Sequence, residues 1–179
     1  MRFLLRLSRA IDQLNEWVGR GVAWLTTLMM LLFVYDVVMR YAFNQTFAAI
    51  FELEWHLFAV IFLVGAGFAF RHDRHVRVDL FYARFSARNK ALVNLIGTLL
   101  FLVPFCLVGI KYGYDFAKNA YNTQEGSPDP GGLPARFLVK SMIPLGLSLL
   151  LLQGISLLCK AILTLGNYHD FFSETQPNA

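Results

Sequence analysis

Long apolar runs alternate with short polar segments along the chain, and this pattern predicts the fold class. A helix needs roughly 20 apolar residues to cross a hydrocarbon core about 30 Å thick. Four stretches of that length are present, at about residues 18–39, 51–70, 91–114 and 137–165. The segments between them are too short to fold separately. We therefore predict an all-α membrane protein, a single membrane domain over residues 1–179 with four transmembrane helices.

A second pattern, of helical period, precedes the first run. One face of the N-terminal segment carries apolar residues, namely Leu4, Leu7, Ile11, Leu14 and Val18. Another face carries polar and mainly basic residues, namely Arg2, Arg6, Arg9, Gln13, Glu16 and Arg20. This pattern predicts an amphipathic interfacial helix on the membrane surface, with leucines at the acyl boundary and arginines among anionic lipid headgroups. A cleaved signal peptide fits less well, because the apolar run is too long and no small-residue cleavage site follows it.

The positions of the basic residues predict an orientation. The chain has 16 Lys and Arg against 12 Asp and Glu, and 56% of its residues are hydrophobic. Basic residues gather in the N-terminal segment and in the second loop, "RHDRHVRVDLFYARFSARNK", while the first loop, "YAFNQTFAAI", has none. Because loops rich in Lys and Arg stay in the cytoplasm, we expect both termini there. No Lys and Arg run is interleaved with aromatic residues, so we expect no nucleic-acid partner.

The second loop also carries apolar residues between its charges, and we expect a short interfacial helix from about Asp79 to Phe85. The histidines of "HDRH" lack the further ligands that a zinc site needs, so a solvated turn is the simpler interpretation. Cys106 and Cys159 lie in apolar runs, where a thiol usually serves packing. We therefore expect no metal and no cofactor.

Charged residues gather where the first and second runs meet the first loop. Asp36 and Arg40 are four apart and share a helix face, and Glu52 and Glu54 begin the second run. The ten-residue loop places Arg40 within reach of either glutamate. Such a cluster either ties two helices together or forms an ion or proton site. We favour the tie, because the cluster lies near the membrane boundary, where a charge costs less.

Enzymatic chemistry has less support. Paired carboxylates can act as general acid and base, but hydrolysis needs a cleft and substrate-binding residues that the sequence does not suggest. Bis-histidine haem ligation needs facing histidines, and only His56 lies within an apolar run. We therefore expect no enzyme activity.

Glycines and prolines inside the runs predict how the helices pack. Gly109 and Gly113 are four apart, a spacing that lets helix backbones approach closely. Pro104 and Pro144 should bend the third and fourth helices, because proline removes a backbone donor from the helix.

Three stretches of the chain form a recognisable series, namely "RYAFN", "ELEWHLFAVIFLVGAGFAFRHDRHVRVDLFY" and "GSPDPGGLPARFLVKSMIPLG". In order and spacing they resemble the DctQ-like small membrane subunits of tripartite ATP-independent periplasmic (TRAP) transporters, and the resemblance extends from about residue 15 to residue 165. It implies a small permease subunit in a bacterial inner membrane, part of sodium-coupled uptake of an organic acid. A periplasmic substrate-binding protein would deliver the acid, a large membrane subunit would transport it, and this chain would be the static scaffold.

The resemblance also marks individual positions. Together with Asp36, the helix-tying or partner-contacting positions are Arg40, Tyr41, Asn44, Glu52, Glu54 and Trp55. In the second loop the marked positions are His75, Arg77 and Asp79. The commoner family form has two adjacent glutamates, whereas Leu53 separates the two glutamates here.

Two other functions stay open from the residues alone. The chain could be a self-sufficient four-helix carrier with Asp36 or Glu54 as the ion-coupling group. It could also be the membrane anchor of a redox complex, which would require bound haem or flavin.

Overall fold

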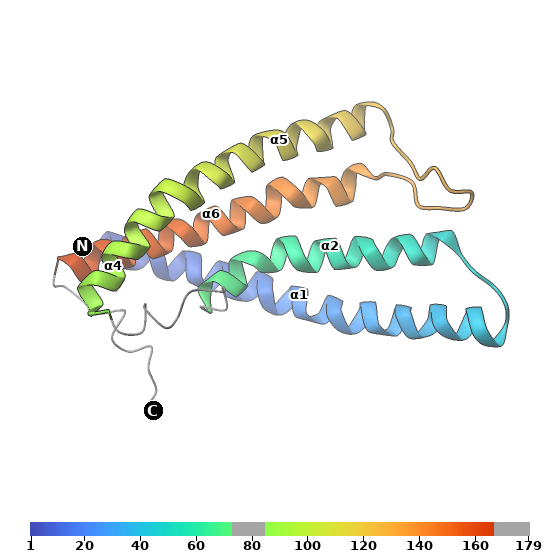
Figure 1. The fold of residues 1–179 in the computed structure, drawn as a ribbon, viewed down its shortest axis with the longest axis horizontal. Coiled ribbons are helices and arrows are strands. Elements are labelled where there is room, and N and C mark those ends of the chain that lie inside the picture. The colour runs from blue at the N-terminus through green and yellow to red at the C-terminus, as the bar shows by residue number, and fades with distance from the viewer. Residues whose placement is uncertain (73–84, 167–179) are drawn as a thin grey trace.

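The computed structural model describes residues 1–72 and 85–166. In these ranges the chain is helical, without β-strands, and its elements follow one another as Figure 1 shows. The elements are α1 (Arg2–Ala42), α2 (Ala48–Arg71), α4 (Ala87–Gly97), the π-helical turn η1 (Thr98–Leu102), α5 (Val103–Asn122) and α6 (Phe137–Leu165). Four helical segments are long and apolar enough to cross a membrane, namely Arg2–Ala42, Ala48–Arg71, Ala87–Asn122 and Phe137–Leu165. The predicted all-α fold with four spans is confirmed.

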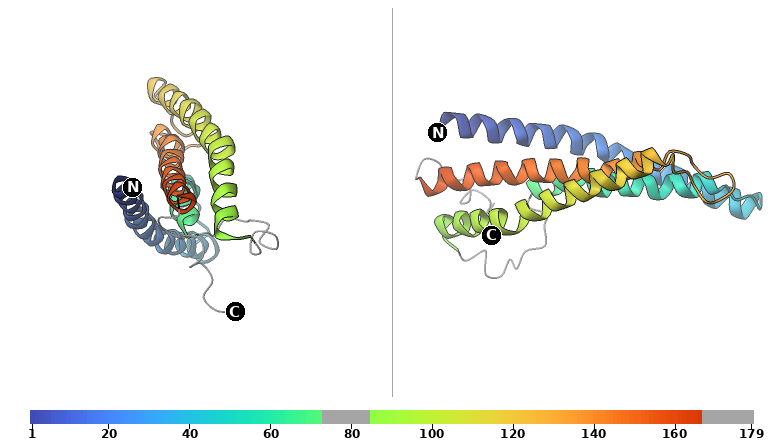
Figure 2. Two further views of the ribbon diagram at one scale, coloured as in Figure 1. Left: turned by 90° about the vertical axis from the view of Figure 1, so that its left-hand side faces the viewer. Right: turned by 90° about the horizontal axis from the view of Figure 1, so that it is seen from above.

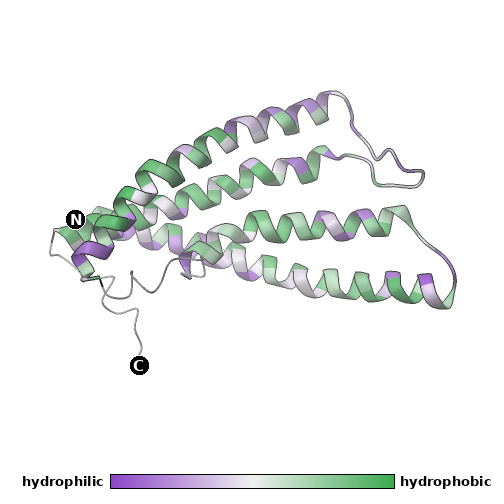
Figure 3. Cartoon of the chain, in the orientation of Figure 1, coloured by the Kyte–Doolittle hydropathy of each residue, from purple (hydrophilic) through white to green (hydrophobic). Residues whose placement is uncertain are grey.

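Helix α6 is the centre of the bundle. It packs against α1, α2, α4, η1 and α5, while α1 packs also against α2. In Figures 1 and 2, α1 and α5 lie on opposite sides of α6. The loops 43–47 and 123–136 lie at one end of the bundle, here called the loop end, and the N-terminus lies at the other, the N-terminal end. Hydrophobic residues dominate the middle of the helices, and hydrophilic ones gather toward both ends (Figure 3).

Helix α1 differs from the prediction at its N-terminal half. It is one helix of 41 residues, about 60 Å long, so the predicted interfacial helix is not separate from the first span. The residues that this half buries are Ser8, Ile11, Asn15 and Gly19, whereas Leu14 is 45% exposed. A mainly small and polar face therefore packs on α6, because α6 offers polar partners there. The placement of this half relative to lipid stays a prediction.

The third span changes direction near Pro104, as predicted. The π-helical turn η1 directly precedes α5, and α4 and α5 point in different directions in Figure 2. Proline donates no backbone hydrogen bond, and a π-turn inserts an extra residue, so both features favour a bend here. The bend keeps α4 against the end of α6, where Ala91 and Ala161 are both fully buried.

Glycines bring helix backbones close together at several points. Gly109 and Gly113 contact α6, but the atoms against them belong to the Leu147 and Ile143 side chains rather than to the α6 backbone. Gly146 of α6 lies so close to the backbone of α2 at Leu63 that a side chain there would collide with a carbonyl oxygen. These approaches match the way helices associate where lipid supplies no hydrophobic drive.

The predicted interfacial helix at Asp79–Phe85 falls mostly outside the described residues. The loop positions His75, Arg77 and Asp79 also lie outside them.

Candidate functional site

The carboxylate of Glu52 is the centre of a polar cluster at the loop end. Glu52 lies near the start of α2 and is only 2% exposed. Ser127 Oγ donates to its Oε1 over 2.5 Å, the Leu133 backbone N–H to its Oε2 over 2.6 Å, and Arg136 Nη2 to Oε1 over 3.0 Å. All three donors belong to the loop 123–136. The charge therefore ties α2 to the loop that leads into α6, because a buried carboxylate is stable only when donors surround it.

The proline- and glycine-rich sequence of this loop makes that arrangement possible. Gly131 has φ of +78° and Ala135 has φ of +62°, so the chain turns sharply on either side of the Leu133 donor. A side chain at Gly132 would collide with Ser127 and reach Glu52. The loop folds tightly around one carboxylate as a result.

A further ion pair closes the base of the loop. Lys140 Nζ lies 2.5 Å from the side-chain Oε2 of Glu125. The Arg136 backbone N–H donates to the backbone carbonyl oxygen of Glu125 over 2.9 Å. The Arg136 guanidinium also lies 5.9 Å from the ring centroid of Trp55, within reach of a cation–π contact. Trp55 thus contributes to the same corner as Glu52.

Arg40 does not make the predicted ion pair with a glutamate in the part of the chain that the structure describes. Its Nη2 lies 2.6 Å from Asp36 Oδ2, one turn earlier in the same helix, and Asp36 is 4% exposed. The tie to Glu52 comes from Arg136 instead. The i,i+4 spacing satisfies Arg40 within α1, so it is not drawn across the loop.

The surroundings of the Glu54 carboxylate differ from those of Glu52. Its Oε1 is buried, and no residue in 1–72 or 85–166 donates a hydrogen bond to it. Its side chain lines an open groove of about 420 Å³ between α1 and α2. The other lining residues are apolar, namely Met29, Met30, Phe33, Val34, Phe51, Trp55 and Phe58.

The remaining marked positions near the first loop do not converge on one point. Tyr41 is 80% exposed. Asn44 has φ of +51°, a conformation that asparagine tolerates, and the Gln45 N–H beyond it bonds to the Met39 oxygen over 3.0 Å. Asn44 therefore shapes the turn that closes α1. The rings of Trp55 and His56 stack at 3.9 Å.

A second polar cluster, at the N-terminal end, has Asp12 of α1 at its centre. Gln153 Nε2 and Ser156 Oγ donate to Asp12 Oδ1 over 2.8 and 2.7 Å, and Lys160 Nζ lies 2.6 Å from Oδ2. Asn15 Nδ2 adds a hydrogen bond to Gln153 Oε1 over 2.9 Å. These bonds hold the N-terminal half of α1 on α6.

Arg71 joins the end of α2 to the same cluster. Its Nη1 donates to the Asp12 backbone oxygen over 2.6 Å and lies 2.6 Å from Glu16 Oε2. Glu16 also pairs with Arg20 at 2.8 Å. Together with the bonds to α6, these contacts connect three helices, α1, α2 and α6.

Sequence reasoning missed this Asp12 cluster, although a signal was present. Gln153, Ser156 and Lys160 recur every three or four residues, so they mark one polar face in an otherwise apolar span. Asp12 and Glu16 form a matching face on the N-terminal segment, where the polar residues were instead expected to face water and lipid headgroups. Two polar faces of equal spacing on different helices indicate a buried contact.

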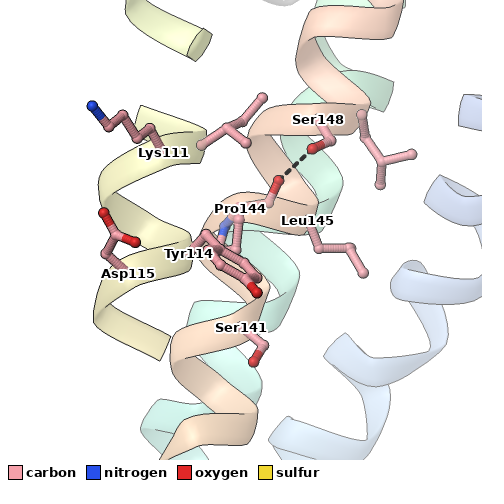
Figure 4. A pocket seen from close by; sticks show the side chains of 9 residues that line it. Lys111, Tyr114, Asp115, Ser141, Pro144, Leu145 and Ser148 are labelled. Carbon is pink, nitrogen blue, oxygen red and sulfur yellow. Dashed lines mark hydrogen bonds between the residues drawn. The ribbon is translucent and has the colours of Figure 1, made fainter. Parts of the chain in front are cut away.

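A groove of about 710 Å³ lies between α5 and α6 (Figure 4). Its two serines are engaged within α6, since Ser148 Oγ donates to the Pro144 oxygen over 2.6 Å and Ser141 Oγ to the Phe137 oxygen over 2.7 Å. Lys111 and Asp115 point away from α6 in the figure. The groove lies around Pro144 of α6, and its two serine hydroxyl groups donate hydrogen bonds to the α6 backbone.

Metal-binding side chains do not gather in the described ranges. No group of three or more His, Cys, Asp and Glu side chains there could hold a metal ion. Cys106 and Cys159 are free and buried.

Comparison with known proteins gives a consistent result. Residues 29–164 match the model of the family described as "Tripartite ATP-independent periplasmic transporters, DctQ component". The C4-dicarboxylate TRAP transporter small permease protein DctQ of Vibrio cholerae serotype O1 is 26% identical over 164 residues, which cover 81% of this chain and 69% of that protein. A protein of Haemophilus influenzae named as a TRAP transporter small permease protein is 28% identical over 106 residues, covering 59% of this chain and 66% of that protein. No solved structure matches.

The family match begins within the first of the four apolar helices found in the described ranges and covers nearly all of the other three. The matched residues include the whole Glu52 cluster and the α6 side of the Asp12 cluster. This multi-pass membrane chain belongs to the DctQ family and is a small permease subunit of a TRAP transporter.

Proposed function

We propose that the chain is the static scaffold beside the large transport subunit, in sodium-coupled uptake of an organic acid across the bacterial inner membrane. A periplasmic substrate-binding protein delivers the acid to the pair. The loop end faces the periplasm and both termini face the cytoplasm, as the distribution of basic residues predicts. In this arrangement the chain transports nothing by itself and catalyses no reaction.

The observation that supports a scaffold most directly is the way the chain uses its own charges. Glu52 accepts three hydrogen bonds from the loop 123–136. Asp12 accepts hydrogen bonds from Gln153 and Ser156 and forms an ion pair with Lys160. Both carboxylates hold helices together at opposite ends of the bundle. A coupling site needs groups that are free to bind and release an ion, so the engagement of Glu52 and Asp12 in helix contacts suits a rigid support better than a carrier.

Reconstitution tests the proposal. Proteoliposomes would hold the large subunit alone, this chain alone, or both, with the binding protein and a panel of radiolabelled organic acids outside and an inward sodium gradient. We expect uptake only when both membrane subunits and the binding protein are present. Uptake by vesicles that hold this chain alone would overturn the proposal and support the self-sufficient carrier.

A further inference from the structure

Glu54 is left in an unusual state for a carboxylate in an apolar helix. Glu52, two positions earlier, has three donors, whereas no described residue donates to the buried Oε1 of Glu54. Arg40 is near enough to attract Glu54, but its guanidinium is paired with Asp36 at 2.6 Å, and the Asp36 carboxylate repels Glu54. Asp36, Arg40 and Glu54 therefore carry one net negative charge when all are ionised. An uncompensated charge of this kind is costly in hydrocarbon and is normally paired.

The surroundings of Glu54 form an apolar groove that opens to the outside of the bundle. Its walls carry side chains that are highly exposed in the isolated chain: Met30 is 63% exposed, Phe51 and Phe58 are each 60%, and Phe33 is 58%. Aromatic residues and methionine are enriched in protein interfaces, and methionine adapts to the shape of its partner. A charged group at the base of such a groove suits one complementary cation.

We propose that this groove receives a transmembrane helix of the large subunit, with a Lys or Arg side chain of that helix against the Glu54 carboxylate. The inference rests on the proposed function and adds the position and the chemistry of the contact. A transmembrane helix with a basic residue would provide an apolar surface against the aromatic walls and a cation against the Glu54 carboxylate. Glu54 lies six positions after the start of α2, about 9 Å along the helix, so the cation is expected one to two turns inside the partner helix.

A lipid is a weaker match to the same groove. Its acyl chains could cover the aromatic walls, but its ammonium group lies in the headgroup layer. That ammonium also lies beside the lipid's own phosphate, so a zwitterionic lipid brings no net positive charge to Glu54, whereas a Lys or Arg side chain does.

A photo-crosslinking experiment tests the position of the contact. The chain offers a matched pair of sites, because Val34 lines the groove, Val108 lies on α5, and each is 56% exposed. A photoreactive amino acid at Val34, in the co-expressed complex, should crosslink to the large subunit, and the same residue at Val108 should crosslink mainly to lipid. A Val34 product that contains only lipid, or crosslinking only from Val108, would overturn the inference.

Mass spectrometry of the crosslinked peptide tests the chemistry. The peptide joined to Val34 should come from an apolar helix that contains Lys or Arg within one to two turns of the crosslink. A partner helix without a basic residue in that range would contradict the proposed pairing.

Glu54→Gln separates a partner contact from a role in the chain's own fold. The variant removes the unpaired charge and keeps the shape, so the isolated chain in detergent should keep or raise its Tm. Recovery of the large subunit by an affinity tag on this chain should fall, by roughly tenfold for a lost charged contact. A lowered Tm with unchanged recovery would show that Glu54 serves this chain alone, and the inference would fail.

The two proposals fail in different ways. If the wild-type chain does not recover the large subunit at all, the proposed function is wrong and the inference falls with it. If recovery is normal but Val34 does not crosslink to the large subunit, the scaffold function stands and only the position of the interface is wrong.

Discussion

The guanidinium of Arg136 lies 3.0 Å from the buried carboxylate of Glu52, so a residue just before the last helix holds the beginning of the second. The two residues are 84 positions apart in the sequence. Ser127 and Leu133 donate to the same carboxylate, which makes Glu52 the organising group of the loop 123–136.

Removing the Glu52 carboxylate should open that loop. In Glu52→Ala, Ser127, Leu133 and Arg136 lose a shared acceptor, and a buried donor without an acceptor is unfavourable. We expect a lower Tm and roughly tenfold faster proteolytic cleavage between residues 123 and 136, since cleavage follows the population of the open loop. Leu53→Ala, next to it in α2 and 36% exposed, is the control and should cleave like the wild type. Unchanged cleavage of Glu52→Ala would contradict the organising role of Glu52.

The contact between α2 and α6 at Gly146 should not tolerate a side chain. An alanine there would place its Cβ against the Leu63 backbone oxygen, which cannot rotate away. We expect Gly146→Ala to destabilise the chain by about 1–3 kcal/mol, the usual cost of overpacking. Gly97→Ala is the matched control, because nothing lies within 4 Å of a Cβ at that helical position. It should stabilise by about 0.5–1 kcal/mol. Unfolding of both variants in detergent, followed by circular dichroism, measures the difference, and equal effects would contradict the close approach.

Asp12 and Lys160 should be energetically coupled. Their side chains are 14% and 24% exposed and lie 2.6 Å apart, so truncating either one leaves the other poorly compensated. A double-mutant cycle of Asp12→Ala and Lys160→Ala should give a coupling free energy of about 1 kcal/mol or more. The pair Glu16 and Arg20 is the control and should couple more weakly, because Arg20 is 76% exposed to screening. A cycle at Asp12 and Lys160 that is no larger than the control would show that α1 is held on α6 by other contacts.

The orientation of the chain can be checked with single cysteines. Gln45 and Arg9 are exposed at opposite ends of the bundle. In intact cells stripped of their outer membrane, a membrane-impermeant maleimide should label Gln45→Cys and should label Arg9→Cys only after lysis. The wild-type chain is the control, since its two cysteines are buried. Labelling of Arg9→Cys in intact cells would reverse the proposed orientation.

Much of the fold could be predicted from the sequence because the membrane imposes simple constraints. A span must be helical and must reach across the hydrocarbon, so apolar run lengths predicted the four spans, and the run at 137–165 coincides with α6. The bend near Pro104 and the glycine contact at Gly109 and Gly113 follow from local chemistry of single residues. The continuity of α1 was not predicted, because its amphipathic pattern suits a membrane surface and a polar helix face equally well.

The sequence by itself determined that charged residues would gather at the loop end, since Asp36, Arg40, Glu52 and Glu54 flank one short loop. Only the tertiary structure decided which of them pair. Glu52 and Glu54 are two positions apart, so about 200° of helix rotation separates them, and they face different neighbours. One meets the donors of the loop 123–136, and the other faces the groove beside α1. The rotation of α2 comes from its packing against α1 and α6, a balance of many long-range contacts that no local pattern in the sequence records.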